Sequence, residues 1–71
     1  MAQEREENHL KNYRESIFLS RAELARKAGL SVGTIERIEK GKSCRMETKK
    51  KIIFALDLEI SELGKIFVND V

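Results

Sequence analysis

The sequence predicts an all-α fold, a compact bundle of about five short helices. Apolar residues recur at helical spacing along most of the chain, and few strand-forming residues stand in alternating runs. The 71 residues include no proline, so no helix is interrupted by a fixed backbone angle or a missing donor. A chain of this length has a small core, and we expect residues 1–71 to form one domain in which residues 1–5 fray.

The first two predicted helices differ in how clearly their ends are marked. One runs from about Glu6 to Ile17, with a single face formed by Leu10, Tyr13, Arg14 and Ile17. The next begins after Ser20, because Ser20 and Glu23 have the spacing of a capping box. In that motif the serine oxygen accepts from the third helical residue, and the glutamate reaches back. Gly29 ends this helix, since glycine adopts positive φ at low cost. Its inward residues are Leu24, Ala25 and Ala28.

The third predicted helix follows after a very short turn. It is capped by Ser31, runs from Val32 to about Lys40 and ends at Gly41, with two inward residues, Ile35 and Ile38. Two short helices joined by a tight turn form the sequence pattern of a helix-turn-helix. A fourth helix is predicted from about Met46 to Leu56, with its inward face formed by Met46, Ile52, Ile53 and Leu56. A fifth contains Ile60, Leu63, Ile66 and Phe67.

Composition argues against several classes of protein. One cysteine and one histidine supply neither a disulfide framework nor a His/Cys metal site, so we expect no metal. We also expect no cofactor, no small-molecule ligand and no enzyme activity, because no nucleophile–base pair and no phosphate-cradling glycine loop is evident. The longest apolar run, 52–56, is too short to cross a membrane, and the polar, acidic first residues do not resemble a signal peptide. We therefore expect a cytoplasmic protein without a membrane partner.

The formal charge of +2 conceals an uneven distribution. Residues 1–20 carry a net charge of −1, residues 21–51 carry +6, and residues 52–71 carry −3. The basic block therefore contains the predicted helix-turn-helix. A basic centre between acidic ends is explained either by a surface for a polyanion or by an ordinary solvated charged face.

A family resemblance rests on residues in and around this block. The matching residues are Leu19-Ser20, Ala22-Glu23-Leu24-Ala25, Ala28-Gly29-Leu30-Ser31, Thr34-Ile35, Ile38-Glu39 and Gly41-Lys42, with Ala55-Leu56 and Ser61-Glu62-Leu63 extending the match. In these the chain resembles the phage repressor and Cro type of helix-turn-helix domain, the XRE-like family, over about residues 8–68. The resemblance implies a lambda-repressor-like bundle of about five helices, in which helices two and three bind double-stranded DNA.

Carried over position by position, the resemblance also implies a role for individual residues. The residues that would face base edges are Val32, Gly33 and Arg37. Those that would lie near phosphates are Arg21, Ser31, Thr34, Lys40, Lys42, Ser43 and Arg45. Arg14 and Glu39 match a structural ion pair that ties helix one to helix three in some relatives. Of the three consecutive lysines that begin at Lys49, only Lys49 stands at the margin of this site.

The chain also departs from the family pattern. Relatives commonly have polar, base-contacting residues at the positions of Val32 and Gly33. Neither Val32 nor Gly33 has a side chain that forms hydrogen bonds. Val32 could instead pack on a thymine methyl group, and Gly33 could allow the helix to approach the DNA closely. Lys49 occupies a position that is usually apolar. Relatives often have proline, a glycine C-cap and a serine N-cap where this chain has Cys44, Asp57 and Glu59. Arg37 has two interpretations: a bidentate contact to guanine, or an exposed side chain paired with Glu23 or Glu36.

These observations favour a prokaryotic or phage-encoded transcriptional regulator that places the helix Val32–Lys40 in the major groove. Two alternatives remain open at this point. The first is a protein–protein module that has kept the fold and lost DNA binding, and the second is the antitoxin of a toxin–antitoxin pair. A homodimer is also expected, through the apolar residues of the last helix, Leu63, Ile66 and Phe67.

Overall fold

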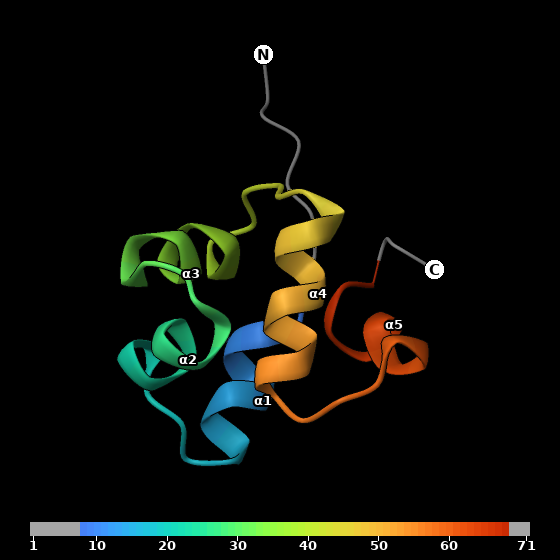
Figure 1. Cartoon of the computed structure of the whole chain (residues 1–71), viewed down its shortest axis with the longest axis horizontal. Helices are drawn as coiled ribbons and strands as arrows, with labels where there is room; N and C mark the ends of the chain where they lie inside the picture. The colour runs from blue at the N-terminus through green and yellow to red at the C-terminus, as the bar shows by residue number, and fades with distance from the viewer. Residues whose placement is uncertain (1–7, 69–71) are drawn as a thin grey trace.

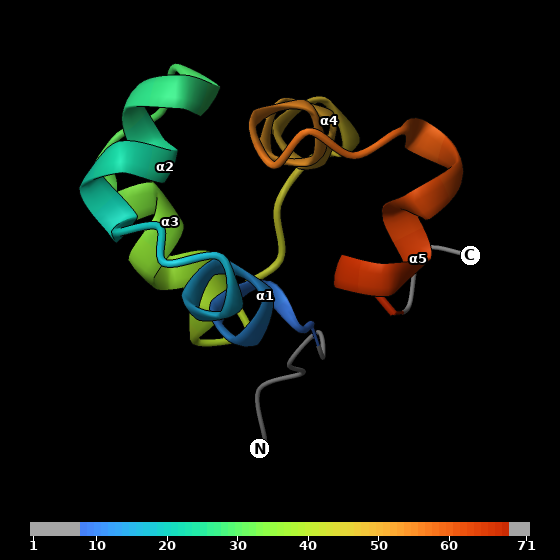
Figure 2. The same cartoon turned by 90° about the horizontal axis from the view of Figure 1, so that it is seen from below.

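The computed structural model describes residues 8–68 and confirms the all-α fold. Its elements are α1 (Leu10–Ser16), α2 (Arg21–Ala28), α3 (Val32–Glu39), α4 (Met46–Ala55), the 3-10 turn η1 (Ile60–Glu62) and α5 (Leu63–Ile66). Figures 1 and 2 show α2 and α3 together on one side of the molecule and α5 on the opposite side. The helices α4 and α1 lie between them, on opposite sides of the core.

The ends of α2 and α3 form by the local interactions that the sequence predicts. The Ser20 hydroxyl accepts from the Glu23 amide at 3.1 Å, and the Glu23 carboxylate accepts from the Ser20 amide at 3.1 Å. These bonds hold the pKa of Glu23 below its ordinary value. Gly29 ends α2 at φ 70°, and Ser31 caps α3 by accepting from the Thr34 amide at 3.1 Å.

The start of α1 is fixed by a contact that the sequence did not reveal. The predicted start at Glu6 lies outside the described residues, and within them the helix begins at Leu10. The Asn8 side chain accepts from the Leu10 amide at 3.1 Å and donates to the Ile38 carbonyl at 2.8 Å. The backbone of Asn8 also forms an antiparallel bridge with Phe67, so the two ends of the described chain lie side by side.

The core is formed by apolar residues from every helix. Its fully buried side chains are Leu10, Leu24, Ile35, Ile52, Ile53 and Ile66. Met46, which was predicted to face inward, is 43% exposed, and so is Ile17, which was assigned to the same face as Leu10. Met46 is the first residue of α4 and Ile17 follows the last residue of α1, so both lie where the chain leaves the core.

The last helix differs most from its prediction. The segment that was expected to form one helix from Ile60 begins as the 3-10 turn η1, and α5 itself has only four residues. The expected dimer residues Leu63, Ile66 and Phe67 are 8%, 0% and 3% exposed. They close the core of the monomer, so little of their surface is left to pair two copies, and the homodimer stays a prediction. Within residues 8–68, no helix is long and apolar enough to span a bilayer.

Candidate nucleic-acid interface

The outward face of α3 is the centre of the candidate interface. Ile35 and Ile38 fix the inward face in the core, which leaves Val32, Gly33 and Arg37 exposed on the outside. Val32 keeps 42% of its surface accessible. The three residues predicted to face base edges therefore share the accessible side of one short helix.

Gly33 is not required by the packing of the protein. A Cβ atom at this position would meet only the Ser31 hydroxyl oxygen, at 3.9 Å, which is an ordinary contact distance. Gly33 also lies in regular helix, where glycine is less stable than alanine by roughly 0.5–1 kcal/mol. The missing side chain leaves the backbone of α3 accessible to whatever docks against this face.

The Ser31 and Thr34 side chains, predicted to lie near phosphates, are engaged with each other. Their hydroxyl oxygens are 2.9 Å apart, and the Ser31 oxygen also caps α3. Ser31 is exposed and Thr34 is half-buried. These hydrogen bonds therefore hold the start of α3, and the Ser31 side chain remains accessible to solvent there.

A buried carboxylate holds α3 against both preceding helices. Glu39, whose side chain is 3% exposed, accepts from Arg14 Nε at 2.7 Å and from Arg21 Nε at 2.9 Å. Arg14 also donates to the Leu19 carbonyl at 2.8 Å, in the connection between α1 and α2. One carboxylate thus joins α1, α2 and α3. One of its two ion pairs is the Arg14–Glu39 pair expected from the resemblance.

The electrostatics of this cluster favour the charged states of Glu39 and Arg21. Burial alone would raise the pKa of Glu39, but the hydrogen bonds from Arg14 and Arg21 outweigh it and lower that pKa. The hydrogen bond to Glu39 also raises the pKa of Arg21. Sequence reasoning assigned Arg21 only to a phosphate and missed this bond. The Arg21 side chain remains 39% exposed.

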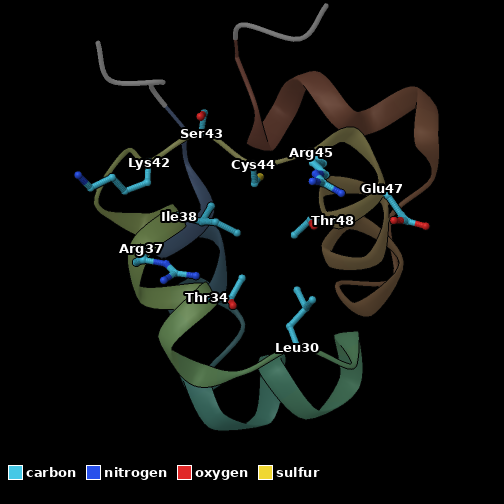
Figure 3. A pocket seen from close by; sticks show the side chains of 10 residues that line it. All are labelled: Leu30, Thr34, Arg37, Ile38, Lys42, Ser43, Cys44, Arg45, Glu47 and Thr48. Atoms are coloured by element: carbon cyan, nitrogen blue, oxygen red, sulfur yellow. The ribbon is translucent and has the colours of Figure 1, made fainter. Parts of the chain in front are cut away.

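A cavity of about 390 Å³ opens beside α3, between that helix and the start of α4. Its lining comes from the turn before α3, from α3, and from the α3–α4 connection with the first turn of α4: Leu30, Thr34, Arg37, Ile38, Lys42, Ser43, Cys44, Arg45, Glu47 and Thr48. Figure 3 shows Arg37 and Thr34 directed into the cavity from α3, whereas Lys42 and Glu47 point away from it on opposite sides. The lining includes three cationic side chains and one anionic side chain, which suits an anionic partner.

The structure brings together most of the predicted site and excludes one residue from it. Lys40 is exposed at the end of α3, and Lys42, Ser43 and Arg45 are exposed in the connection that follows. Lys49, placed at the margin of the site from sequence, is 4% exposed and cannot reach DNA. Its ammonium nitrogen lies 5.5 Å from the centroid of the Phe67 ring, so it belongs to the core between α4 and the end of α5.

Some residues of the site were not found from sequence. Glu47 and Thr48 line the cavity, but nothing in the sequence indicated that the first turn of α4 faces a cavity. Asn8 supports the end of α3 through the Ile38 carbonyl, and its distance in sequence from α3 concealed that contact. Among residues 8–68, Arg37 forms no ion pair with a carboxylate, although Glu23 and Glu36 were possible partners.

Comparisons with known proteins agree with this geometry. The family model for the Cro/C1-type helix-turn-helix DNA-binding domain matches residues 9–67. The crystal structure of the restriction-modification controller protein C.AhdI from Aeromonas hydrophila matches with a TM-score of 0.72 and 30% sequence identity. The match covers 78% of this chain and 85% of that chain. No curated protein matches the sequence. Because the family model spans most of the chain, this protein belongs to the family of Cro/C1-type helix-turn-helix DNA-binding domains.

Proposed function

We propose that this protein is a transcriptional regulator that binds specific sites in double-stranded DNA, with α3 in the major groove. One observation carries the proposal: α3 presents Val32, Gly33 and Arg37 on an open face, while the buried Glu39 carboxylate holds the same helix rigidly against α1 and α2. A reading helix must be both accessible and fixed in orientation. The similarity to a restriction-modification controller supports a regulatory role. Such a protein acts without a cofactor and without catalysis, in the cytoplasm where the DNA lies.

Recognition of bases is divided between one polar and two apolar positions. The Arg37 guanidinium is suited to a bidentate contact with guanine O6 and N7, which contributes about 1–3 kcal/mol of discrimination. Val32 offers a branched apolar surface to a thymine methyl group, and Gly33 lets the helix backbone lie close to the base edges. Neither Val32 nor Gly33 distinguishes bases by side-chain hydrogen bonds.

Binding strength comes from the cations around this face. We assign Arg21, Lys40, Lys42 and Arg45 to phosphates, with Ser31, Thr34 and Ser43 beside the same backbone. If four phosphates are neutralised per domain, the logarithm of the binding constant falls with the logarithm of salt concentration at a slope of about −3.6. One helix reads only a few base pairs, so tight binding requires two copies on half-sites about 34 Å apart.

The test is selection of bound sequences from a random DNA pool, followed by titration against salt. We expect a shared, palindromic site. Arg37→Ala should relax the preference at one position of each half-site with little change in salt slope, and Arg37→Lys should do the same because it keeps the charge but loses the planar fork.

Lys42→Ala should reduce the magnitude of the slope by about 0.9 per domain and leave the selected sequence unchanged. Lys65→Ala removes the same charge from α5, on the opposite side of the molecule from α3, and should leave the slope unchanged. Recovery of no shared site, or affinity that is independent of salt, would reject the proposal.

The second candidate function is a protein–protein module, and the apolar pair Val32 and Gly33 favours it. In that case α3 would bind an apolar strip on a protein. DNA affinity would then be weak and unselective, and Arg37→Ala would not alter base preference. The salt titration separates the two functions, because counterion release is a property of the nucleic-acid partner.

A further inference from the structure

We propose that the cavity between α3 and the start of α4 binds a small apolar carboxylic acid in its ionised form, and that this ligand draws Arg37 away from DNA. The binding site is argued from the size, the lining and the charge of the cavity. Its regulatory effect rests on the proposed function, because it requires that Arg37 also contacts a base.

The cavity is large enough for a small ligand, and its floor is apolar. Its volume of about 390 Å³ falls in the range of roughly 300–1,000 Å³ that is usual for ligand sites. Ile38 belongs to the core and is 2% exposed, and Leu30 and Cys44 pack against the same core. Figure 3 shows the Ile38 and Leu30 side chains directed toward the middle of the cavity. The floor therefore favours a ligand with an apolar body.

The rim of the cavity is polar and positively charged. Thr34 on α3 and Thr48 on α4 line it from opposite walls, and Arg37 and Arg45 lie beside them. Among residues 8–68, neither arginine forms an ion pair with a carboxylate. Glu47, the acidic residue of the lining, points away from the cavity. The charge that faces the cavity is therefore positive.

The apolar floor and the cationic rim together select the class of ligand. A carboxylate accepts two parallel hydrogen bonds from a guanidinium group, and threonine hydroxyl groups donate further bonds. An apolar ring system attached to that carboxylate would cover Ile38 and Leu30. Inorganic phosphate, or a phosphate group of DNA, has no apolar part with which to do so. No single sequence motif marks the site, because its walls come from α3, from α4 and from the turn before α3.

Arg37 connects this cavity to the face of α3 that we assign to DNA. It follows Gly33 and Thr34 by one helical turn, so it lies between the outward face of α3 and the wall of the cavity. Its side chain is directed into the cavity in Figure 3, whereas a base contact requires it to turn outward beside Gly33. A carboxylate in the cavity would hold the guanidinium group there. The ligand and DNA then compete for one side chain, and each lowers the affinity for the other by the same factor.

The first experiment is calorimetric titration of the free protein with three probes. Naphthoate carries the charge and the apolar body, naphthamide carries the same body without the charge, and inorganic phosphate carries only the charge. We expect naphthoate to bind, and naphthamide to bind roughly tenfold more weakly because it loses the charge-assisted hydrogen bonds. Absence of naphthoate binding, or phosphate or naphthamide binding as tight as that of naphthoate, would overturn the proposal.

Two substitutions locate the bound naphthoate. Thr48→Leu places a larger apolar side chain in the cavity and should abolish binding. Arg45→Gln removes a charge from the rim and should weaken binding roughly tenfold. Arg26→Gln is the matched control, because Arg26 is an exposed arginine of α2 outside the lining, and it should leave the affinity unchanged. Equal losses in Arg45→Gln and Arg26→Gln, with both variants folded by circular dichroism, would reject the cavity as the site.

The second experiment adds DNA at constant salt concentration. Saturating naphthoate should weaken binding of the wild-type protein to its selected site and should have little effect on Thr48→Leu, which keeps every residue assigned to DNA. An unchanged DNA affinity of the wild-type protein would overturn the regulatory effect. If the wild-type protein selected no DNA site, the proposed function would fail, while naphthoate binding to the free protein that is lost in Thr48→Leu would still support the ligand site.

Discussion

The half of the molecule that contains α2 and α3 is organised differently from the half that contains α4, η1 and α5. In the first half, side-chain hydrogen bonds cap both helices, a glycine turns the chain between them, and Glu39 joins three helices. In the second half, α4 has no side-chain cap, and the helices are held by apolar packing around Ile52, Ile53 and Ile66. The comparison teaches that the half that contains the helix-turn-helix is fixed in orientation by polar contacts, which depend on geometry more strictly than apolar contacts do.

The largest expected effect concerns the carboxylate that joins the first half. Glu39→Ala leaves the buried Arg14 without its closest charged partner and removes one partner from Arg21. We expect a loss of roughly 3–5 kcal/mol in the free energy of unfolding, the range for breaking a buried ion pair. Urea denaturation measures it. Glu36→Ala, an exposed glutamate on the same helix, should change stability by less than about 0.5 kcal/mol. Equal losses of unfolding free energy in the two variants would mean that the ion pairs of Glu39 do not stabilise this half of the molecule.

Acid should weaken the same cluster. The pKa of Glu39 is lowered from 4.5 in the folded protein, so its contribution to stability is complete above that value and is lost as pH falls through the lower folded pKa. Wild-type stability should therefore approach that of Glu39→Gln as pH falls below 4.5, because both side chains are uncharged once Glu39 is protonated. Denaturant titrations at several pH values test this. A difference between the two proteins that does not change with pH would contradict it.

The capping residues provide a smaller test of the comparison. Ser20→Ala should destabilise the protein by about 1 kcal/mol, since it removes the acceptor for the Glu23 amide at the start of α2. The corresponding change in the second half, Glu62→Ala, removes the acceptor for the Glu59 amide at the start of a three-residue turn. We expect it to cost less than Ser20→Ala. The reverse order in thermal denaturation would show that local capping does not set the two halves apart.

The smallest expected effect has the opposite sign. Gly33→Ala should stabilise the protein by roughly 0.5–1 kcal/mol, because the new methyl group meets only the Ser31 hydroxyl oxygen, and alanine favours helix. The same variant should bind DNA more weakly, since the methyl group enlarges the face that approaches the bases. Thermal denaturation and DNA titration on one preparation measure both effects. A variant that is more stable and binds equally well would remove Gly33 from the interface.

The first half of the fold was predictable because its signals are local. Ser20 with Glu23, Gly29 and Ser31 each act on backbone within about four residues, so their spacing alone specifies where α2 and α3 begin and where α2 ends. Asp57 provides a contrast in the second half. It adopts φ 61° at the end of α4, where relatives often have glycine, so the turn forms without the residue that usually marks it.

The contacts that were missed depend on residues far apart in sequence. The Arg21 bond to Glu39 and the Asn8 bond to Ile38 join segments whose proximity only the folded chain determines. The periodicity that placed Leu63, Ile66 and Phe67 on one apolar face was informative, but it does not tell whether the core or a partner covers that face. Lys49 was misassigned for a related reason, because a lysine can bury its aliphatic stem and place its ammonium group over an aromatic ring.

Asn8 and Phe67 form a backbone bridge between the two ends of the described chain. One amide beside this bridge can show whether the two ends are in contact. The His9 amide donates to the Ile66 carbonyl at 2.8 Å, across almost the whole described sequence. Contacts of such long range require closure of a large loop, which costs conformational entropy. The rate at which the His9 amide exchanges its hydrogen with solvent therefore measures how often the N-terminal segment detaches from α5. The neighbouring Asn8 side chain also holds the Ile38 carbonyl of α3, so an opening that displaces Asn8 also releases one support of that helix.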